Sequence, residues 1–307
     1  MSGIMTTPSL DKNLLVAKIV EQFRHADQLY YKRALLEVFD DQGRFIGDNV
    51  FETTFKLRPD RAPLIYEVSG PYDSVSKEYA TVAKVFHRGQ LEFQFDLKPG
   101  IFQRTAAMVW IYLEALKHKV GRVLFLGAGK VARHTAEYLK HFCPGLQAVD
   151  YADLERRING FETPLRELGV KASYLETVEF SLYDTIIMAT TTTQCLIHEG
   201  NITAVKPGAV AVSLATTSPS GEIAAEVYAR PDVNVFLDYE LSKTFTGDMR
   251  KANDLGYLQK TIVYKELLKG GAAADLGSRR NIVRLTGTPL QNVAVVDLML
   301  ELEKISL

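Results

Sequence analysis

The sequence has few of the residues and motifs that define several large classes of protein. Its 307 residues include only two cysteines, Cys143 and Cys195, with no CxxC pair and no metal-ligand spacing. A disulfide framework or a structural zinc site therefore has little support, and we predict no metal. Motifs of the GxSxG, HExxH and P-loop types are absent. Hydrolase, zinc-protease and nucleotide-triphosphatase hypotheses thus lack a starting residue.

Charge and hydropathy exclude further classes. The net charge is -1, so no basic field favours nucleic acid or an anionic membrane as a partner. No apolar run approaches the about 20 residues of a membrane-spanning helix. The first residues, MSGIMTTPSL, lack the basic start and apolar core of a signal peptide. We expect a cytoplasmic protein.

What the sequence does contain is the pattern of a two-domain α/β protein. With 47% hydrophobic and 24% charged residues, a chain of this length can bury a full core and divide into two domains. Residues 10–31 have helical apolar spacing, and residues 34–57 alternate like strands around the turn signal at 41–43. From residue 122 onward, continuous apolar runs alternate with helical ones. This pattern predicts a parallel sheet of the doubly wound Rossmann type.

A short glycine-rich loop carries the strongest functional signal. The apolar run VLFLGAG leads directly into the helical segment KVARHTAEYL. In such a context Gly127 permits the tight turn, Gly129 lets the backbone approach a diphosphate, and Ala132 allows close helix packing. Asp150 ends the next apolar run, 23 residues after Gly127. This offset is close to the roughly 20 residues at which an acid accepts hydrogen bonds from the adenine ribose.

The alternative is that the loop is only a tight turn and Asp150 a solvated residue at a strand end. Strand, helix, spacing and acid agree here, which favours dinucleotide binding. A carboxylate repels a 2′-phosphate, so NAD is favoured over NADP, although Arg156 and Arg157 could hold that phosphate instead. Two later segments, MATTTT (188–193) and SLATTSP, follow strands at the edge where ligands bind. Their threonines could equally form local turns.

Three segments resemble the ornithine cyclodeaminase and mu-crystallin family: IFQRTAAMVWIYLEAL, GRVLFLGAGKVARHTAEYL and NIVRLTGTPLQNVAVVDLML. The most specific piece is the Arg-Thr-Ala-Ala run, preceded by Asp96. The resemblance implies a homodimer with a substrate-binding and dimerisation domain (1–118 with 278–307) and an NAD(P)-binding domain (119–277). Members of the family act on small amino or imino acids with a nicotinamide cofactor. The predicted cofactor contacts are Gly127, Gly129, Lys130, Val131, Asp150, Tyr151, Thr190, Thr191, Leu214 and Gly287.

The resemblance also implies residues that hold the substrate. Arg104 matches the arginine that binds the substrate carboxylate, a role suited to the two-pronged guanidinium. Lys84 is the best match to a family lysine on a strand, and Lys77 is its rival. The group that moves the proton stays open between Lys84, His87 and Glu222.

Two departures from the family pattern bear on the chemistry. Ser220 or Gly221 falls where cyclodeaminases carry an aspartate, and Asn292 stands where the family often has an acid. Hydride transfer needs only a cofactor, a carboxylate clamp and one proton carrier. We therefore predict an NAD(H)-dependent oxidoreductase acting on the α-carbon of a small amino or imino acid. The alternatives are a cyclodeaminase with recycled NAD and a non-catalytic dinucleotide-binding protein.

Overall fold

The structure, a computed structural model, describes most of the chain. The described residues are 5–6, 9–26, 29–39, 45–58, 61–70, 72–73, 78–79, 81–192, 194–214, 221–244, 247–270 and 275–303. Contacts between Cα atoms divide the chain into two compact units. Unit 1 comprises Met1–Arg104 and Thr288–Leu307, and unit 2 comprises Thr105–Gly287.

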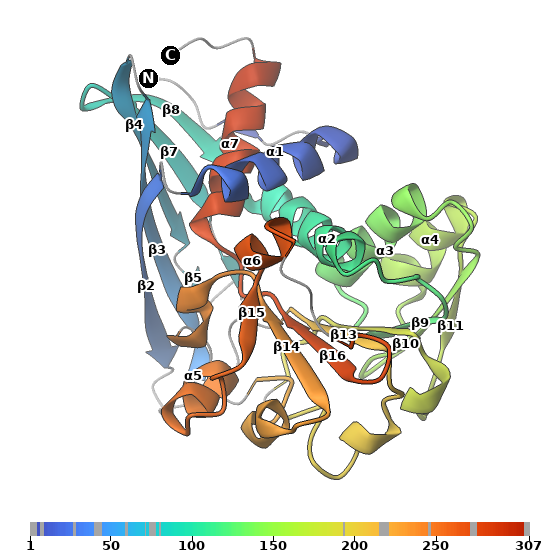
Figure 1. Ribbon diagram of the computed structural model, residues 1–307. Coiled ribbons are helices and arrows are strands. Elements are labelled where there is room, and N and C mark those ends of the chain that lie inside the picture. The colour runs from blue at the N-terminus through green and yellow to red at the C-terminus, as the bar shows by residue number, and fades with distance from the viewer. Residues whose placement is uncertain are drawn as a thin grey trace. The chain divides into compact units, whose positions relative to one another are not determined.

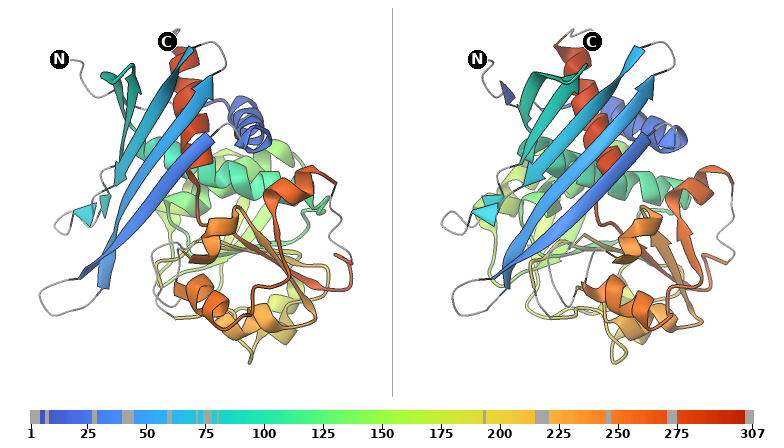
Figure 2. Two further views of the ribbon diagram at one scale, coloured as in Figure 1. Left: turned by 60° about the vertical axis from the view of Figure 1, so that its left-hand side comes forward. Right: turned by 90° about the vertical axis from the view of Figure 1, so that its left-hand side faces the viewer.

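Unit 1 contains a six-stranded, mainly antiparallel sheet in the order β1-β8-β7-β4-β3-β2. Its strands are β1 (Met5–Thr6), β2 (Leu29–Phe39), β3 (Phe45–Arg58), β4 (Arg61–Gly70), β7 (Val82–His87) and β8 (Gln90–Asp96), and β5 (Tyr72–Asp73) pairs with β6 (Glu78–Tyr79). Two helices, α1 (Lys12–Arg24) and α7 (Pro289–Leu302), contact each other, and α7 contacts β2 and β3 (Figure 2).

The first helix is shorter than its sequence pattern predicts. Asp11 caps α1 by accepting a hydrogen bond from the Leu14 amide at 2.9 Å, and α1 buries Leu15, Ile19 and Phe23. The helix ends at Arg24, and β2 begins at Leu29. Aromatic residues that follow favour a strand. The expected turn at 41–43 lies outside the described residues.

The last helix is mostly apolar, and it carries a buried carboxylate near its middle. Asp297 is 9% exposed, and its carboxylate accepts hydrogen bonds from Tyr66 Oη at 2.7 Å, from Gln22 Nε2 at 3.1 Å and from the Lys56 amine. A buried carboxylate is tolerated when it is paired and hydrogen-bonded. This cluster therefore joins α7 to α1, β3 and β4.

Unit 2 contains an all-parallel eight-stranded sheet in the order β11-β10-β9-β12-β13-β16-β14-β15 (Figure 1). The strands are β9 (Val123–Leu126), β10 (Ala148–Ala152), β11 (Lys171–Tyr174), β12 (Thr185–Met188), β13 (Val210–Ser213), β14 (Val233–Leu237), β15 (Thr261–Val263) and β16 (Arg280–Arg284). Its helices are the larger part of α2 (Lys98–Ala115), α3 (Lys130–Phe142), α4 (Thr163–Glu167), α5 (Gly247–Asp254) and α6 (Tyr264–Leu268). The residues of β9, β12 and β13 are all buried, as expected of strands covered on both faces.

The strand order confirms the Rossmann-type prediction. From β9 the chain moves through α3 to β10 on one side, and it returns to β12 on the other side of β9. Such a reversal is the point at which ligands of open α/β sheets bind, at the carboxyl ends of the strands. The fold therefore places the loops after β9, β10 and β12 at a candidate ligand site.

The division into units differs from the boundaries predicted from sequence. Residues 278–287 belong to unit 2, because β16 pairs with both β13 and β14 inside the parallel sheet. Residues 105–118 also belong to unit 2, since the division falls within α2, between Arg104 and Thr105. The functional roles assigned to the two domains stay predictions.

A buried ion pair lies at the end of β16. Arg284 donates from Nε and Nη2 to the two carboxylate oxygens of Asp248 at 3.1 Å each, and both side chains are 0% exposed. Tyr228 Oη donates to the same carboxylate at 2.8 Å. Burial opposes the charge on Arg284, but Asp248 outweighs it, so the pKa of Arg284 lies above its usual value. The pair fixes α5 to the sheet.

Candidate functional site

The glycine loop after β9 has the geometry of a turn that only glycine fits. Gly127 has a φ of +86°, and a Cβ built on it would lie 2.5 Å from the Ala189 carbonyl oxygen. Its amide donates to the Ala152 carbonyl at 2.8 Å. The loop after β9 is thus held against the last residue of β10 and the residue that follows β12. A side chain at this position would force them apart.

The second glycine leaves the start of α3 open. Gly129 precedes α3 in extended backbone, and a Cβ built on it would have no atom within 4 Å. Gly129 and Lys130 are exposed, Val131 is half-buried, and Ala132 is fully buried, as close packing requires. Amides at a helix start attract anions, and no side chain at Gly129 blocks the approach of an anion to these amides. The residues present therefore fit a diphosphate.

Asp150 lies further from this loop than its sequence position suggests. It pairs with Leu124 in the middle of β9, two residues before the carboxyl end of β10. Its carboxylate accepts hydrogen bonds from Arg122 at 3.0 and 3.2 Å and from Tyr183 Oη at 3.0 Å. These partners come just before β9 and β12. Burial, together with the Asp150 hydrogen bond, raises the pKa of Tyr183 to about 12.

A different acid, Asp153, stands at the edge of the glycine loop. It follows Ala152, which pairs with Leu126 at the end of β9. Its Oδ2 accepts a hydrogen bond from the Ala128 amide at 3.0 Å, and its Oδ1 accepts one from the Leu154 amide at 2.7 Å. Sequence reasoning missed this residue because it stopped at the first acid. The strand continues through Tyr151 and Ala152, and that continuation was the available signal.

The neighbouring arginines are engaged by acids. Arg156 forms two hydrogen bonds with Glu162, at 2.6 and 2.9 Å, and this contact holds the pKa of Glu162 below its usual value. Arg157 contacts Asp153 at 3.2 Å and Glu155 at 2.5 Å. Both guanidinium groups therefore already have carboxylate partners.

Tyr151, a predicted cofactor contact, has its side chain in the core. The residue is 0% exposed, and its ring packs against Phe161 and Tyr174. Its hydroxyl donates to Glu162 at 2.7 Å, and burial raises its pKa to about 12. Only the backbone of Tyr151 is placed at the strand edge.

Glu222 joins the loops that follow β12 and β13. It is 0% exposed, and its Oε1 accepts hydrogen bonds from the amide and hydroxyl of Thr190, both at 2.7 Å. Its Oε2 accepts hydrogen bonds from Ser213 Oγ at 2.8 Å and from the Leu214 amide at 3.2 Å. Glu222 thus fixes Thr190 and Leu214, while Thr191 is exposed. Thr193 and Ser220 lie outside the described residues.

Gly287 is held at the carboxyl end of β14. It has a φ of +74°, and its amide donates to Asp238 Oδ2 at 2.9 Å, as does the Thr286 amide. Asp238 is 1% exposed and also accepts a hydrogen bond from Ser242 Oγ at 2.6 Å. The predicted contacts Gly127, Thr190, Leu214 and Gly287 therefore lie in loops at the carboxyl edge of one sheet.

In unit 1, Arg104 is bound by the first turn of α7. Its Nη1 donates to Gln291 Oε1 at 2.7 Å, and its Nε donates to Asn292 Oδ1 at 3.1 Å. Both acceptors are amide oxygens, so these two bonds orient the guanidinium without cancelling its charge. The sequence singled out Arg104 and Asn292 but did not anticipate Gln291.

Lys84 lies on β7, where it pairs across the sheet with Glu67 and Gln94. It is half-buried, while its neighbours Ala83 and Val85 are fully buried and point to the other face of the sheet. His87 ends the same strand. The structure does not bring either residue into a hydrogen bond with Arg104, and Lys77 lies outside the described residues.

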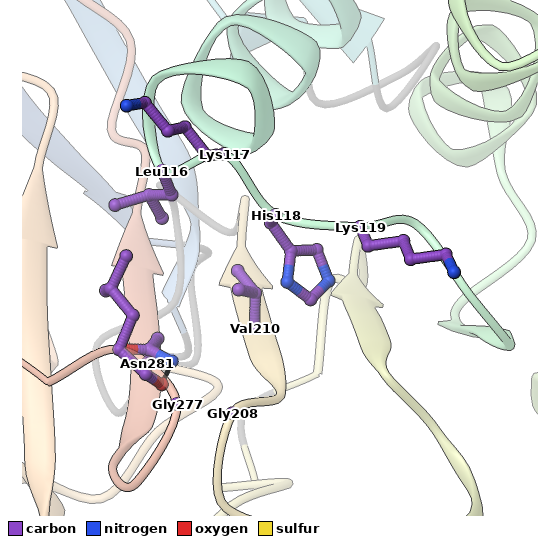
Figure 3. A pocket seen from close by; sticks show the side chains of 9 residues that line it. Leu116, Lys117, His118, Lys119, Gly208, Val210, Gly277 and Asn281 are labelled. Carbon is purple, nitrogen blue, oxygen red and sulfur yellow. Dashed lines mark hydrogen bonds between the residues drawn. The ribbon is translucent and has the colours of Figure 1, made fainter.

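A separate hollow of about 130 Å³ lies at the opposite, amino-terminal edge of the parallel sheet (Figure 3). It is lined by Leu116, Lys117, His118, Lys119, Gly208, Val210, Leu276, Gly277 and Asn281. Figure 3 shows both lysine amines pointing away from the imidazole.

The described residues contain no group of three or more histidine, cysteine, aspartate or glutamate side chains that could hold a metal ion. None of their helices is long and apolar enough to cross a membrane.

Comparisons of the sequence with protein-family models and with curated proteins find no match. Solved structures do match over nearly the whole chain. A probable ornithine cyclodeaminase from Bordetella pertussis Tohama I has a TM-score of 0.79 at 18% identity, over 99% of both chains. A pyrroline-2-carboxylate reductase from Thermococcus litoralis, solved with NADH and L-proline, has a TM-score of 0.80 at 15% identity, over 98% of both chains. An archaeal alanine dehydrogenase dimer with bound NAD has a TM-score of 0.77 at 18% identity, over 98% of this chain and 96% of that one.

The chain has the ornithine cyclodeaminase fold. The fold that the sequence resemblance implied is thereby confirmed.

Proposed function

We propose that this protein is an NAD(H)-dependent oxidoreductase that transfers hydride between nicotinamide and the α-carbon of a small amino or imino acid. The observation that carries the proposal is the glycine loop. Position 127 requires glycine because its φ is positive and because a Cβ there would lie 2.5 Å from the Ala189 carbonyl oxygen. Gly129, by contrast, leaves the start of α3 unobstructed. This combination suits the backbone approach that a diphosphate needs.

The acid that binds the adenine ribose is proposed to be Asp153 rather than Asp150. Asp153 is next to the glycine loop and already contacts Ala128, whereas Asp150 faces Arg122 and Tyr183. A carboxylate there disfavours a 2′-phosphate. Because Arg156 and Arg157 are paired with acids, neither is placed to receive that phosphate, which supports NAD.

The substrate group bound by unit 1 is proposed to be a carboxylate. The Arg104 guanidinium can donate two parallel hydrogen bonds to a carboxylate and so fix the α-carbon. Nicotinamide, when bound, supplies or accepts the hydride, which carries two electrons. A proton must then reach or leave the substrate nitrogen, and Lys84 and His87 stay the candidates for that step.

Glu222 is not proposed as the proton carrier. Its two oxygens accept hydrogen bonds from Thr190, Ser213 and Leu214 in a fully buried position. The side chain therefore cannot replace the aspartate that the sequence lacks near Gly221. This favours hydride transfer over cyclodeamination, which is the second candidate because a probable cyclodeaminase shares the fold.

The test measures cofactor binding and turnover separately. NADH and NADPH are titrated by fluorescence, and rates are followed with NAD and L-alanine or L-proline, and with NADH and pyrroline-2-carboxylate. Tighter binding of NADH and net change in NADH are expected. Ammonia release without net NADH formation would favour the cyclodeaminase, and NADH binding without turnover would favour a binding protein. Absence of binding by either dinucleotide would refute the proposal.

Replacing Arg104 tests the division of roles. Arg104→Ala is expected to lower kcat/KM by about a hundredfold or more, since charge-assisted hydrogen bonds contribute about 1.5–3 kcal/mol each. The Kd for NADH should stay unchanged, because the proposed cofactor residues all belong to unit 2. Parallel loss of both would contradict the assignment.

We also propose that the protein is a homodimer, as the archaeal alanine dehydrogenase with this fold is. Sedimentation equilibrium at micromolar concentration tests the proposal, and a monomer mass of 34.3 kDa would contradict it.

A further inference from the structure

The first turn of α7 has two buried polar groups that form no hydrogen bond with any described residue. Thr288 precedes the helix and Pro289 begins it, an arrangement typical of a helix start. The Thr288 hydroxyl does not cap the helix, although threonine in this position commonly does. Thr288 Oγ1 and Gln291 Nε2 are both buried without a hydrogen-bond partner among the described residues. The two residues are 3% and 1% exposed.

Most buried polar side-chain atoms in proteins have a partner. Two unpaired atoms three residues apart, at the positively polarised end of a 14-residue helix, therefore need an explanation. Both atoms can donate a hydrogen bond: one belongs to a hydroxyl and the other to an amide NH₂. Their natural partner is an acceptor, and an anion suits the helix end best.

The Gln291 amide lies beside the group that attracts such an anion. Its Oε1 accepts a hydrogen bond from Arg104 Nη1 at 2.7 Å, so its Nε2, on the same planar amide, is adjacent to the guanidinium. Asn292 fixes the guanidinium from Nε at 3.1 Å. Gln291 thus both orients Arg104 and directs an unused N–H beside it.

We propose that Gln291 Nε2 donates a hydrogen bond to the ligand carboxylate held by Arg104, with the Thr288 hydroxyl as a second donor. This inference rests on the proposed function and adds to it the residues that position the carboxylate. Both donor atoms are covered in the present structure, so binding includes a local rearrangement at the start of α7. The ligand then gives each buried donor the acceptor it lacks.

The proposal distinguishes Gln291 from a residue that only supports Arg104. Gln291→Glu keeps an oxygen for Arg104 and adds an acid at a helix start, so the variant should fold at least as well as the wild type. It also turns the free donor into an acceptor, which repels a carboxylate. A merely structural role predicts retained binding, whereas direct contact predicts its loss.

The experiment is calorimetric titration of L-proline and L-alanine into the protein, alone and with NADH. Gln291→Glu is compared with Asn292→Asp, which places the same charge against the same guanidinium from the other side. Thr288→Val removes the hydroxyl at nearly constant volume. Melting temperatures of all three variants are measured, and Thr288→Val is expected to melt no lower than the wild type, because its hydroxyl has no partner to lose.

Gln291→Glu is expected to weaken amino-acid binding at least fivefold more than Asn292→Asp does, and Thr288→Val to weaken it at least threefold. Smaller losses of amino-acid affinity would contradict the proposed contact of the residue that was changed. Wild-type protein that binds neither amino acid, with or without NADH, overturns the whole inference. Failure of NADH binding, measured separately, would instead refute the proposed function, since amino-acid binding to the protein alone still tests the Gln291 contact.

Discussion

At the scale of single residues, the two candidate acids near the glycine loop make opposite predictions. Asp153→Asn is expected to raise the Kd for NADH about ten- to a hundredfold, because a charged acceptor for the ribose hydroxyls is worth about 1.5–3 kcal/mol. Asp150→Asn should leave that Kd unchanged and lower the melting temperature, since it breaks the contacts with Arg122 and Tyr183. Fluorescence titration and thermal melting separate the two. Weaker NADH binding by Asp150→Asn, with unchanged binding by Asp153→Asn, would instead assign the ribose contact to Asp150.

The two glycines of the loop separate stability from binding in the same way. Gly127→Ala places a Cβ 2.5 Å from the Ala189 oxygen on a backbone with positive φ, and it is expected to destabilise the fold by more than about 1 kcal/mol. Gly129→Ala meets no atom within 4 Å and should fold normally. Its Cβ instead occupies the space where a diphosphate would approach, so NADH binding should weaken. Normal NADH binding by Gly129→Ala would place the diphosphate elsewhere.

At the scale of elements, the loops after β12 and β13 depend on one carboxylate. Glu222→Gln puts an NH₂ group against donors, and each buried donor left unpaired costs about 1–3 kcal/mol. Ser213→Ala removes only one of those hydrogen bonds and should cost about 1 kcal/mol. The free energy of unfolding, measured by chemical denaturation, should therefore be much lower for Glu222→Gln than for Ser213→Ala. Equal values would show that Glu222 is not the link between the loops.

Strands with continuous apolar runs could be predicted from the sequence. The position of a side chain that depends on how strands pair could not. The buried strands β9, β12 and β13 follow from the runs VLFL, TIIM and VAVS, since strands covered on both faces are mostly apolar. Asp150 was predicted as the ribose acid and Asp153 was not considered, because the sequence does not show where β10 ends against β9. The Arg104–Gln291 contact joins residues 187 positions apart, and no local pattern indicates it.

The same limit explains the domain boundary. The resemblance assigned residues 278–287 to the domain of the last helix, whereas Arg280–Arg284 forms β16 between β13 and β14. Its charged end, Arg284, is satisfied by Asp248 from a distant helix, α5. A buried charge is compatible with a central strand only when such a partner exists, and the partner is known only from the fold.

At the scale of the whole molecule, the free energy of unfolding should decrease in two separate steps as the pH is lowered. His118 is partly buried, with its Nε2 3.0 Å from Thr185 Oγ1, and burial lowers its pKa below the ordinary value of 6.5. The unfolded chain therefore binds this proton at a higher pH than the folded chain does. His118 costs no stability above pH 6.5, and stability is lost as the pH falls from that value through the folded pKa. Asp184 and Asp232, whose pKa values lie below 3.8, add a second loss only at more acidic pH.

His118→Gln should therefore flatten the dependence of unfolding free energy on pH between about 7 and 5, while leaving the acidic step in place. His141→Gln, which removes an exposed imidazole from α3, is the matched control for the loss of a histidine. Urea unfolding at closely spaced pH values measures both curves. Because the slope equals the difference in bound protons between the unfolded and folded chains, an unchanged slope in His118→Gln would show that another group releases the proton on folding.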